Sequence, residues 1–412
     1  MMSMQDGFKL YFNEKAKFMY HGQQVIICNR LTGMWIKIPR EYYEIIKLGI
    51  DNKLTEEELL ERLYDDEDRR TIRKAIEKID SLGVLYPYVP NNEWHEISLA
   101  LTAQCNLRCR HCIAEADIGK KEHFDTDQMY KILDKIIKVR PHNLILTGGE
   151  PMIRKDFFQL LAYIRKRYDG NITLMTNGTL IDETNVRGLI ETINNIDISI
   201  DGADEESCKI VRGAGVFPRV MSAIKLLQRY GMKNISLSMV LSGNNKYYVQ
   251  DFFTLNKNLG THPVLRNLTY DGRAKENREY LEQKYTSRSE KSYGQKQKPF
   301  YAGCTCTAGY TKIKIEADGS IYPCEIFLEE QYKLGNVCKI EDLNEIAERV
   351  ERGTFLAPCI AKFEPDQIEQ CKNCEYTYLC WHCLKEAKFL EQKDFQIYCK
   401  GRKEYLQGLW ER

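Results

Sequence analysis

The feature that most constrains the fold is a regular alternation of apolar strands and amphipathic helices between Glu96 and about Asp271. Six strands are expected at 96–101, 143–147, 172–176, 196–200, 235–240 and 264–269. Helical periodicity lies between them, as in 126–140, 155–168 and 217–230. Repeated strand–helix units predict a parallel sheet with crossover helices, curled into a partial, TIM-like (β/α)6 barrel over residues 95–272. Functional residues are then expected at the carboxyl ends of the strands.

The residues before this α/β region predict a small separate module at 1–90. Short strand-like segments at 17–20, 24–29 and 34–38 precede helical patterns that begin near Pro39, Thr55 and Asp68. The third helix is expected to end at Gly83, before a short apolar strand. Strands, three helices and a returning strand are typical of a winged-helix module.

The residues after the barrel divide into a polar stretch and a cysteine-rich stretch. Residues 273–300 are strongly polar, which predicts a linker or lid. Residues 301–412 contain most of the fifteen cysteines, which fall into groups. In a chain without features of a secreted protein, grouped cysteines more often bind metal than form disulfides. We therefore expect a C-terminal domain that depends on metal for its stability.

Charge and hydropathy exclude several partners. Lysine plus arginine number 60 and aspartate plus glutamate 59, so the formal charge of +1 does not favour nucleic acid or an anionic membrane. The N-terminus shows no signal peptide, and no apolar run has the length of a membrane span. A cytoplasmic protein without nucleic-acid or membrane partners is predicted.

Three cysteines, Cys105, Cys109 and Cys112, directly follow the first barrel strand. They are therefore expected on one loop at the carboxyl end of that strand, with three thiolates directed to one point. A four-iron cubane held by three thiolates leaves one iron open to a small molecule, whereas structural zinc sites usually fill all four positions. The group therefore indicates a reactive iron-sulfur cluster.

The CxxxCxxC spacing on this loop resembles the radical S-adenosylmethionine (SAM) superfamily, in which the open iron binds the amino and carboxylate groups of SAM. Further motifs match in the same order along the strands: TGGEP at 147–151, MTNGT at 175–179, ISIDG at 198–202 and VRGAG at 211–215. The resemblance implies a [4Fe-4S] cluster on the three cysteines and the following SAM-binding residues: His111, Gly148, Gly149, Glu150, Asn177, Ser199, Asp201 and Arg212.

Each of these residues alone has a plainer explanation. The GGEP segment could be only a turn, Ser199 and Asp201 could cap a following helix, and Arg212 could be a solvated surface residue. Their common order at successive strand ends favours the SAM-binding interpretation.

The C-terminal cysteines resemble the SPASM extension of these enzymes, which binds two auxiliary cubane clusters. The resemblance implies that Cys324 and Cys383, with Cys306 and Cys304 as the open alternatives, hold the inner cluster. The implied ligands of the outer cluster are Cys371, Cys374, Cys380 and Cys399. Two spacings differ from the family, since CWHC has two residues between its cysteines instead of three and CTC is unusually short. The inner cluster is thus expected either to be fully ligated or to keep an open iron.

Structural zinc is the alternative for this region, because CKNC and CWHC are each typical of a zinc ribbon. The chain would then be a non-catalytic regulator with a winged-helix head. Eight cysteines exceed one tetrahedral site, and a radical initiator in the same chain favours iron-sulfur clusters.

The N-terminal module is not basic enough for a typical nucleic-acid reader, since residues 55–70 are acidic. It resembles the peptide-recognition element of maturases of ribosomally made peptides. In those enzymes a leader peptide adds a strand to the sheet of the module. The alternative is a module that only stabilises the fold.

Together these resemblances imply a radical SAM maturase that abstracts hydrogen from a precursor peptide with a 5'-deoxyadenosyl radical. An external one-electron reductant such as flavodoxin or ferredoxin is implied. The expected product is a thioether, and the alternatives are carbon–carbon crosslinking, peptide oxidation and maturation of a sulfatase. Glu325 resembles the acidic proton acceptor of sulfatase-maturing relatives, and it could also be a solvated acid beside a cluster loop.

Overall fold

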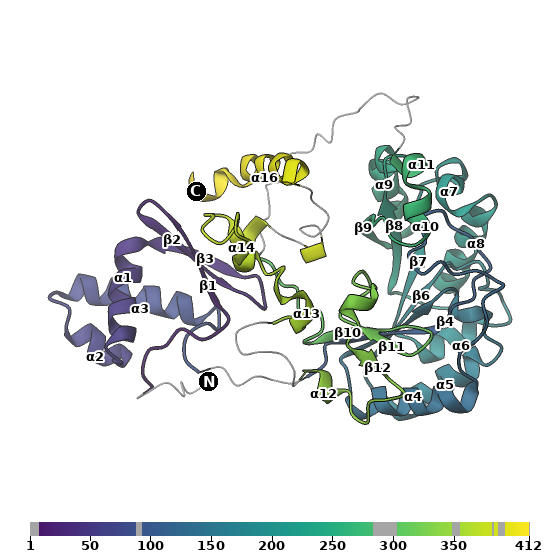
Figure 1. Ribbon diagram of the computed structural model, residues 1–412, viewed down its shortest axis with the longest axis horizontal. Helices are drawn as coiled ribbons and strands as arrows, with labels where there is room; N and C mark the ends of the chain where they lie inside the picture. The colour runs from purple at the N-terminus through teal and green to yellow at the C-terminus, as the bar shows by residue number, and fades with distance from the viewer. Residues whose placement is uncertain are drawn as a thin grey trace. The chain divides into compact units, whose positions relative to one another are not determined.

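The computed structural model describes residues 8–87, 93–282, 303–347, 355–380, 383–385 and 392–411. The chain divides into two compact units, and each is assembled from separate stretches of sequence (Figure 1). Unit 1 comprises residues 1–91, 296–308 and 349–412, and unit 2 comprises residues 92–295 and 309–348. The C-terminal cysteines are therefore shared between the two units.

The N-terminal part of unit 1 is an antiparallel sheet followed by three helices. Its elements are β1 (Ala16–His21), β2 (Gln24–Asn29), β3 (Trp35–Pro39), α1 (Arg40–Asp51), α2 (Glu56–Glu61) and α3 (Asp66–Asp80). Thr55 and Asp65 cap α2 and α3 through their side chains, which stabilises helices in this acidic segment. The predicted returning strand is wrong, because Leu85 forms only an isolated bridge with Phe12.

The sheet of unit 1 is buried on both faces. Val25 and Ile27 of β2 join the core formed with α1, α2 and α3. The intervening residues Ile26 and Cys28 face a second buried cluster, because side chains alternate along a strand. That cluster contains C-terminal residues, namely Tyr376, Tyr378, Leu379, Leu406, Leu409 and Trp410. The C-terminal elements are α13 (Pro358–Ala361), η4 (Pro365–Gln367), α14 (Thr377–Cys380), α16 (Gln392–Leu406) and α17 (Gly408–Glu411).

Unit 2 contains a nine-stranded sheet with the order β12-β11-β10-β4-β5-β6-β7-β8-β9. Strands β4 to β9 are parallel to one another. They are β4 (Glu96–Thr102), β5 (Asn143–Gly148), β6 (Asn171–Thr176), β7 (Asn195–Ser199), β8 (Ile235–Leu241) and β9 (His262–Asn267). All six predicted barrel strands are present, which confirms the partial α/β barrel.

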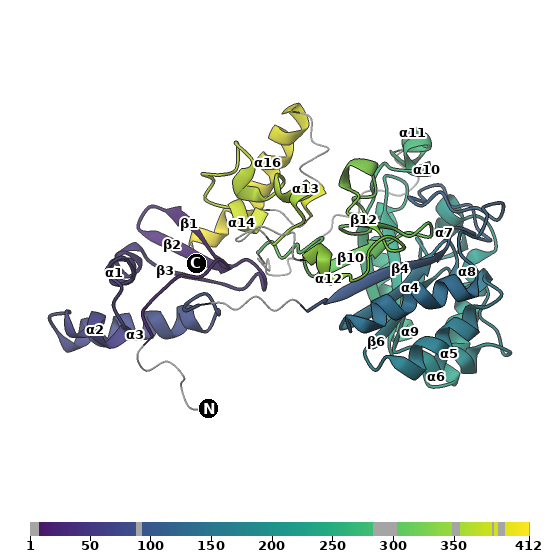
Figure 2. The same cartoon turned by 60° about the horizontal axis from the view of Figure 1, so that its bottom comes forward.

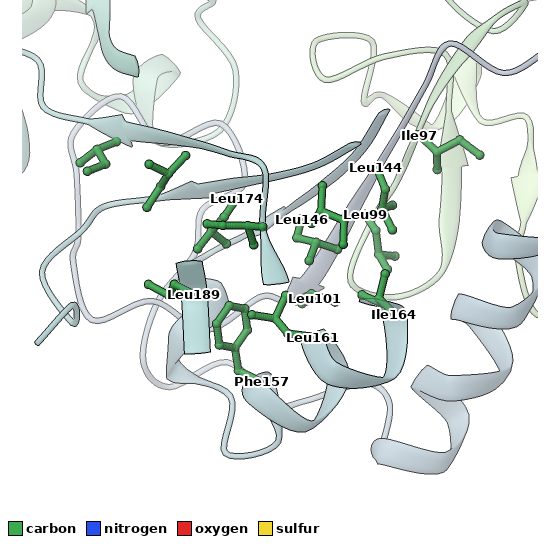
Figure 3. Close-up of a cluster of buried hydrophobic side chains, with 14 of the residues drawn as sticks. Ile97, Leu99, Leu101, Leu144, Leu146, Phe157, Leu161, Ile164, Leu174 and Leu189 are labelled. Atoms are coloured by element: carbon green, nitrogen blue, oxygen red, sulfur yellow. The ribbon is translucent and has the colours of Figure 1, made fainter. Parts of the chain in front are cut away.

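Crossover helices cover the sheet of unit 2 (Figure 2). They are α4 (Thr126–Lys138), α5 (Phe157–Arg167), α6 (Val186–Thr192), α7 (Glu205–Arg212), α8 (Val216–Arg229) and α9 (Val249–Leu259), with short turns η1 (Pro151–Ile153) and η2 (Lys246–Tyr248). Figure 3 shows Leu99, Leu146 and Leu174 of three adjacent strands close to Phe157 and Leu161 of α5. Among the described residues, no helix combines the length and the apolar character needed to cross a membrane.

A hairpin from the C-terminal part of the chain extends this sheet. Strand β10 (Lys312–Ile315) pairs in parallel with β4, β11 (Ser320–Tyr322) pairs antiparallel with β10, and β12 (Gly335–Asn336) follows. Gly319 has a φ of 81° in the turn before β11, a conformation that suits glycine. Helix α12 (Asn344–Ala347) ends this part of unit 2.

The start of the predicted polar linker is structured. Helices α10 (Arg273–Glu276) and α11 (Arg278–Glu282) occupy its first ten residues, and Arg273, Ala274 and Leu281 are buried. The linker prediction is therefore wrong for this part, because its apolar and arginine side chains pack on the barrel. The remainder of the predicted linker, 283–300, lies outside the described residues.

Candidate functional site

The three-cysteine loop starts directly after β4, at the carboxyl edge of the parallel sheet. Cys109 is buried, and Cys105 and Cys112 are partly exposed. Burial raises the pKa of the Cys109 thiol to about 11, against the opposing charge of Arg212. Such a thiol gives up its proton at neutral pH when a metal takes the place of that proton. The loop is therefore suited to bind iron.

Two glycines at the end of β5 allow close contact with this loop. Gly148 has a φ of 135°, and a Cβ there would lie 2.4 Å from the carbonyl oxygen of Thr102. A Cβ on Gly149 would lie 2.0 Å from the carbonyl oxygen of Gln104. The N–H groups of Gly149 and Glu150 donate to these two carbonyls, each at 2.8 Å. Glycine is therefore required here for the backbone of β5 to hold the base of the loop.

We expect the Gly149→Ala substitution to displace the cysteine loop, because the new methyl group and the Gln104 oxygen cannot occupy the same space. SAM affinity should fall by at least about tenfold, the usual effect of disturbing the support of a metal ligand. Equilibrium binding of SAM to the anaerobically reconstituted protein measures this. Gly401→Ala is the control, since a Cβ there meets nothing within 4 Å. Wild-type affinity in the Gly149 variant would contradict the prediction.

The end of β6 is tied to the same loop through Glu150. This carboxylate is fully buried and accepts hydrogen bonds from Thr176 Oγ1 at 2.8 Å and from the Asn177 N–H at 2.7 Å. Burial raises its pKa, against the effect of these donors. The Asn177 amide donates to Asn106 at 2.8 Å and lies 3.9 Å from the Cys105 sulfur. Glu150 therefore fixes the β6 end beside the cysteine loop.

Asp201, beyond the end of β7, connects two of the residues predicted to bind SAM. It is fully buried, has a φ of 56°, and lies 2.6 Å from His111 Nε2 and 2.7 Å from Arg212 Nε. Burial alone would raise the pKa of Asp201, but Arg212 and His111 lower it to about 2. Arg212 also lies 3.9 Å from the Cys109 sulfur. Ser199, the last residue of β7, is half-buried and lies opposite Ser238 in the sheet.

We expect Asp201 to make the stability of the protein sensitive to acid. Its folded-state pKa of about 2 is below the ordinary value of 3.8, so its stabilisation is complete well above pH 4 and is lost as the pH falls toward 2. Between pH 5 and pH 2, Asp201→Asn should therefore lose less unfolding free energy than the wild type, by on the order of 2 kcal/mol. Urea unfolding of the metal-free protein measures this. The exposed Asp127→Asn variant should behave like the wild type, and equal pH slopes in all three proteins would contradict the prediction.

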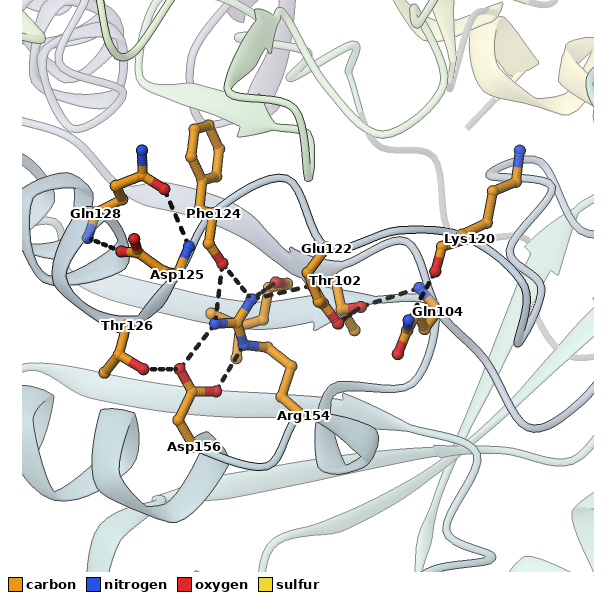
Figure 4. Close-up of polar contacts among 11 residues, drawn as sticks. Thr102, Gln104, Lys120, Glu122, Phe124, Asp125, Thr126, Gln128, Arg154 and Asp156 are labelled. Atoms are coloured by element: carbon orange, nitrogen blue, oxygen red, sulfur yellow. Dashed lines mark hydrogen bonds and ion pairs between the residues drawn. The ribbon is translucent and has the colours of Figure 1, made fainter.

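Arg154 is a supporting residue that sequence reasoning missed. Its guanidinium donates to the carbonyl of Leu101 at 3.0 Å, to Glu122 at 3.0 Å and to Asp156 at 2.8 Å (Figure 4). Glu122 in turn accepts a hydrogen bond from Thr102 Oγ1 at 2.7 Å. Arg154 thereby links the end of β4, the segment after the cysteine loop and the turn after β5. The only sequence signal was its position four residues after Glu150, the glutamate of the GGEP segment.

Arg273 supports the cysteine loop from the other side. Its Nε donates to the Cys109 carbonyl at 3.0 Å, and its NH1 donates to the Ala116 carbonyl at 2.9 Å. The preceding Gly272 has a φ of 55°, and a Cβ there would lie 2.4 Å from the Ile113 carbonyl oxygen. Sequence reasoning placed these residues in or beside a linker, because polar composition does not reveal such backbone contacts.

The cysteines predicted to hold the outer auxiliary cluster lie together in unit 1. A small cavity of about 20 Å³ has all four in its lining: Cys371, Cys374, Cys380 and Cys399. Burial raises the pKa of Cys380 to about 11 and also raises that of Cys374. Within the described residues, no three Cys, His, Asp or Glu side chains converge on the position of a single metal ion.

The residues predicted for the inner cluster are divided between the units. Cys324 follows β11 in unit 2, whereas Cys304, Cys306 and Cys383 belong to unit 1. Cys304 is buried, and Cys306 and Cys383 are partly exposed. This ligand set stays a prediction, including the choice between Cys304 and Cys306.

Arg30, in the turn after β2, holds the backbone of the CTC segment. Its side chain is fully buried and donates to the carbonyls of Cys304 at 2.8 Å and Cys306 at 2.9 Å. Two further hydrogen bonds join it to the buried carboxylate of Glu364. A residue of the N-terminal module therefore sets the position of two candidate cluster ligands.

Glu325 lies at the other end of the barrel from the cysteine loop. Its carboxylate is 3.7 Å from Lys312 Nζ, and the same ammonium is 3.9 Å from Glu96, the first residue of β4. Burial alone would raise the pKa of Glu325. The positive charges of Lys312 and Lys314 outweigh this effect and hold the pKa below its ordinary value. At about 3.3 Å per residue, the length of β4 separates Glu325 from the cysteine loop by roughly 20 Å.

Comparison with known protein families agrees with this arrangement. Residues 99–255, from β4 into α9, match the radical SAM superfamily. The chain contains a radical SAM domain. Residues 304–375 match the SPASM iron-sulfur cluster-binding domain. The radical SAM match includes the cysteine loop and every predicted SAM-binding residue, and the SPASM match begins at Cys304.

Two relatives of this radical SAM enzyme differ in their named activities. It is 25% identical over 311 residues to the mycofactocin maturase MftC of Mycobacterium ulcerans, covering 70% of this chain and 82% of MftC. It is 26% identical over 353 residues to the AdoMet-dependent heme synthase of Methanosarcina barkeri, covering 74% of this chain and 97% of that protein.

Solved structures of Streptococcus suis SuiB have the same fold as this radical SAM enzyme. SuiB bound to S-adenosylmethionine aligns with a TM-score of 0.55 and 18% identity, covering 92% of this chain and 97% of SuiB. SuiB bound to the precursor peptide SuiA aligns with a TM-score of 0.54 and 17% identity, covering 93% and 97%. The structural similarity to SuiB therefore covers more of this chain than the radical SAM barrel.

Iron-sulfur clusters and SAM are the cofactors of these domains, and the residues present fit them. Cys105, Cys109 and Cys112 provide three thiols on one loop, and the glycine pair at the end of β5 leaves room for close backbone contacts. Among the described residues, the buried His111 Nδ1 has no hydrogen-bond partner, so a bound ligand could supply one.

Proposed function

We propose that this radical SAM enzyme matures a ribosomally synthesised peptide in the cytoplasm. The observation that carries the proposal is the composition of unit 1, in which the predicted peptide-recognition module shares a buried core with the SPASM cysteines. The name of the relative MftC and the complex of SuiB with its precursor peptide support the same substrate class. The electron donor is an external one-electron carrier such as flavodoxin or ferredoxin.

The N-terminal sheet is the proposed site of leader binding. A leader peptide that adds a strand to an edge of this sheet gains main-chain hydrogen bonds, and side-chain pockets along the sheet set its register. Because both faces of the sheet are already buried, edge pairing is the mode of binding that leaves the fold unchanged. Leader binding then keeps the core segment of the peptide attached to the enzyme.

In the barrel, the predicted SAM-binding residues described above hold SAM in one orientation. The reduced cluster with bound SAM supplies a 5'-deoxyadenosyl radical. The backbone at Gly148 and Gly149 provides close approach for the methionine part of SAM. Asp201 keeps Arg212 and His111 in fixed orientations, and Glu150 fixes the end of β6 through Asn177. These contacts position the reactive carbon before the radical forms.

We propose a thioether as the product. Its formation removes two hydrogens from the peptide: the radical takes one as a hydrogen atom, and the cysteine thiol loses the other as a proton. Coupling of the carbon radical with the thiolate leaves one electron over, and the auxiliary clusters held by the SPASM cysteines would accept it. Glu325 is the proposed proton acceptor, because it directly follows Cys324, a predicted ligand of the inner cluster.

The test has two parts: an assay of the anaerobically reconstituted enzyme for 5'-deoxyadenosine, and co-expression with each short cysteine-containing peptide encoded by a neighbouring reading frame. We expect SAM-dependent release of 5'-deoxyadenosine and a peptide lighter by two hydrogens, with the cysteine thiol blocked to alkylation. A loss of two hydrogens with the thiol still free would contradict a thioether and indicate another crosslink or a dehydrogenation. An unchanged peptide mass would indicate epimerisation. Zinc in place of iron and no deoxyadenosine with any reductant would overturn the enzyme assignment.

A further inference from the structure

A cavity of about 420 Å³ lies beside the cysteine loop in unit 2. Its lining contains five cationic residues and one acidic residue: Arg108, Arg110, Lys209, Arg212, Arg273 and Glu276. A concentration of positive charge at this position favours an anionic partner.

The inner wall of this cationic cavity touches a predicted cluster ligand. Arg212 NH1 lies 3.9 Å from the Cys109 sulfur, and Arg273 Nε donates to the Cys109 carbonyl at 3.0 Å. Both arginines are buried and both line the cavity. Because Arg108 and Arg110 of the lining belong to the cysteine loop, a molecule seated in the cavity lies directly against that loop.

The outer rim of the cationic cavity is accessible. Arg108, Arg110 and Lys209 are exposed. Lys209 pairs with Glu206 at 2.6 Å, and Arg108 lies 3.9 Å from Asp117. The Arg110 guanidinium instead lies 4.2 Å from the centre of the Tyr280 ring.

The cationic cavity keeps a net positive charge. In the part of the chain that the structure describes, no carboxylate forms an ion pair with Arg110 or Arg273. These two arginines therefore present uncompensated charge on the rim and on the inner wall.

We propose that an acidic one-electron carrier protein docks on this cationic cavity to reduce the cluster. The proposal rests on the proposed function, because it requires a reducible cluster on the cysteine loop. Complementary charge speeds the encounter and orients the carrier, so that its redox centre faces the cysteine loop. One electron passes from the carrier to the cluster, and no bond is formed or broken in this step.

The experiment compares two electron donors for the reconstituted full-length enzyme. One donor is reduced flavodoxin, an acidic carrier, and the other is dithionite with a viologen mediator, which needs no protein docking. In the Lys209→Glu/Asn277→Glu variant, whose two residues line the cavity outside the cysteine loop, we expect flavodoxin-driven 5'-deoxyadenosine formation to fall at least about tenfold at low ionic strength. Viologen-driven formation should stay within about twofold of the wild type. Added salt should slow the wild type with flavodoxin and have little effect on the variant.

The matched control is Lys225→Glu, an exposed residue of α8 outside the cationic cavity. The Lys225→Glu variant should form 5'-deoxyadenosine as fast as the wild type with both donors. An unchanged flavodoxin rate in the double variant overturns the docking proposal, and so does an equal loss with both donors, which would indicate damage to the cysteine loop. Inhibition by inorganic phosphate at matched ionic strength would also overturn it and identify a small-anion pocket. Absence of deoxyadenosine from the wild type with viologen overturns the proposed function instead.

Discussion

Cys109→Ala is expected to release no 5'-deoxyadenosine above background, even with excess viologen reductant. Cys109 is buried on the loop after β4, where Arg212 lies 3.9 Å from its sulfur and Arg273 donates to its carbonyl. Alanine removes one of three thiols, and the two that remain cannot hold a four-iron cluster that keeps its open iron in place. Iron content and the absorbance of the reconstituted barrel cluster should fall together with activity.

Cys338→Ala is the matched control for this substitution. Cys338 is exposed and lies outside the cysteine loop, so its replacement should leave the iron bound by that loop and deoxyadenosine formation unchanged. Normal turnover in the Cys109 variant would show that the cysteine loop does not hold the reactive cluster.

Arg30→Met is expected to lower the free energy of unfolding by about 3–5 kcal/mol, because it leaves the buried carboxylate of Glu364 without its partner. The substitution also removes the donors to the Cys304 and Cys306 carbonyls. Iron bound to the SPASM cysteines should therefore fall, while the cluster of the cysteine loop in unit 2 remains. Chemical denaturation under anaerobic conditions and iron analysis measure the two effects separately.

Two variants test the cause of this loss. Adding Glu364→Gln to Arg30→Met should restore part of the stability, because the unpaired charge is removed. Arg40→Met is the surface control, since the Arg40–Glu44 pair is half exposed and should contribute no more than about 1 kcal/mol. Equal losses in the Arg30 and Arg40 variants would contradict a special role for the buried pair.

The barrel could be predicted from the sequence because its signals are local. Each strand, such as β5 at Asn143–Gly148, is a short apolar run, and each functional motif follows directly at its end. The parallel arrangement then brings separate motifs to one edge of the sheet. His111, Asp201 and Arg212, which lie in three different motifs, contact one another in the structure.

The remaining features depend on contacts between distant parts of the chain. Pairing of β10 with β4 joins residues more than two hundred positions apart, and nothing in either segment specifies the other. The supporting arginines donate mainly to backbone carbonyls and carboxylates, and such contacts leave no spacing pattern in the sequence. These arginines are Arg30, Arg154 and Arg273. The prediction of a strand near Leu85 was wrong for a related reason, since this short segment forms only a single bridge, with the distant Phe12.

The shared core beneath the N-terminal sheet determines how this enzyme can be re-engineered. A truncated chain that lacks the first 90 residues would expose Tyr378, Leu406 and Trp410 and would leave Glu364 buried without Arg30. Inactivity of such a truncation would therefore report misfolding of the SPASM region instead of lost peptide recognition. A recognition module borrowed from another maturase would meet the same difficulty unless its outward face matched this core. Substrate range in this enzyme is thus better altered by point substitutions along the sheet than by exchange of whole modules.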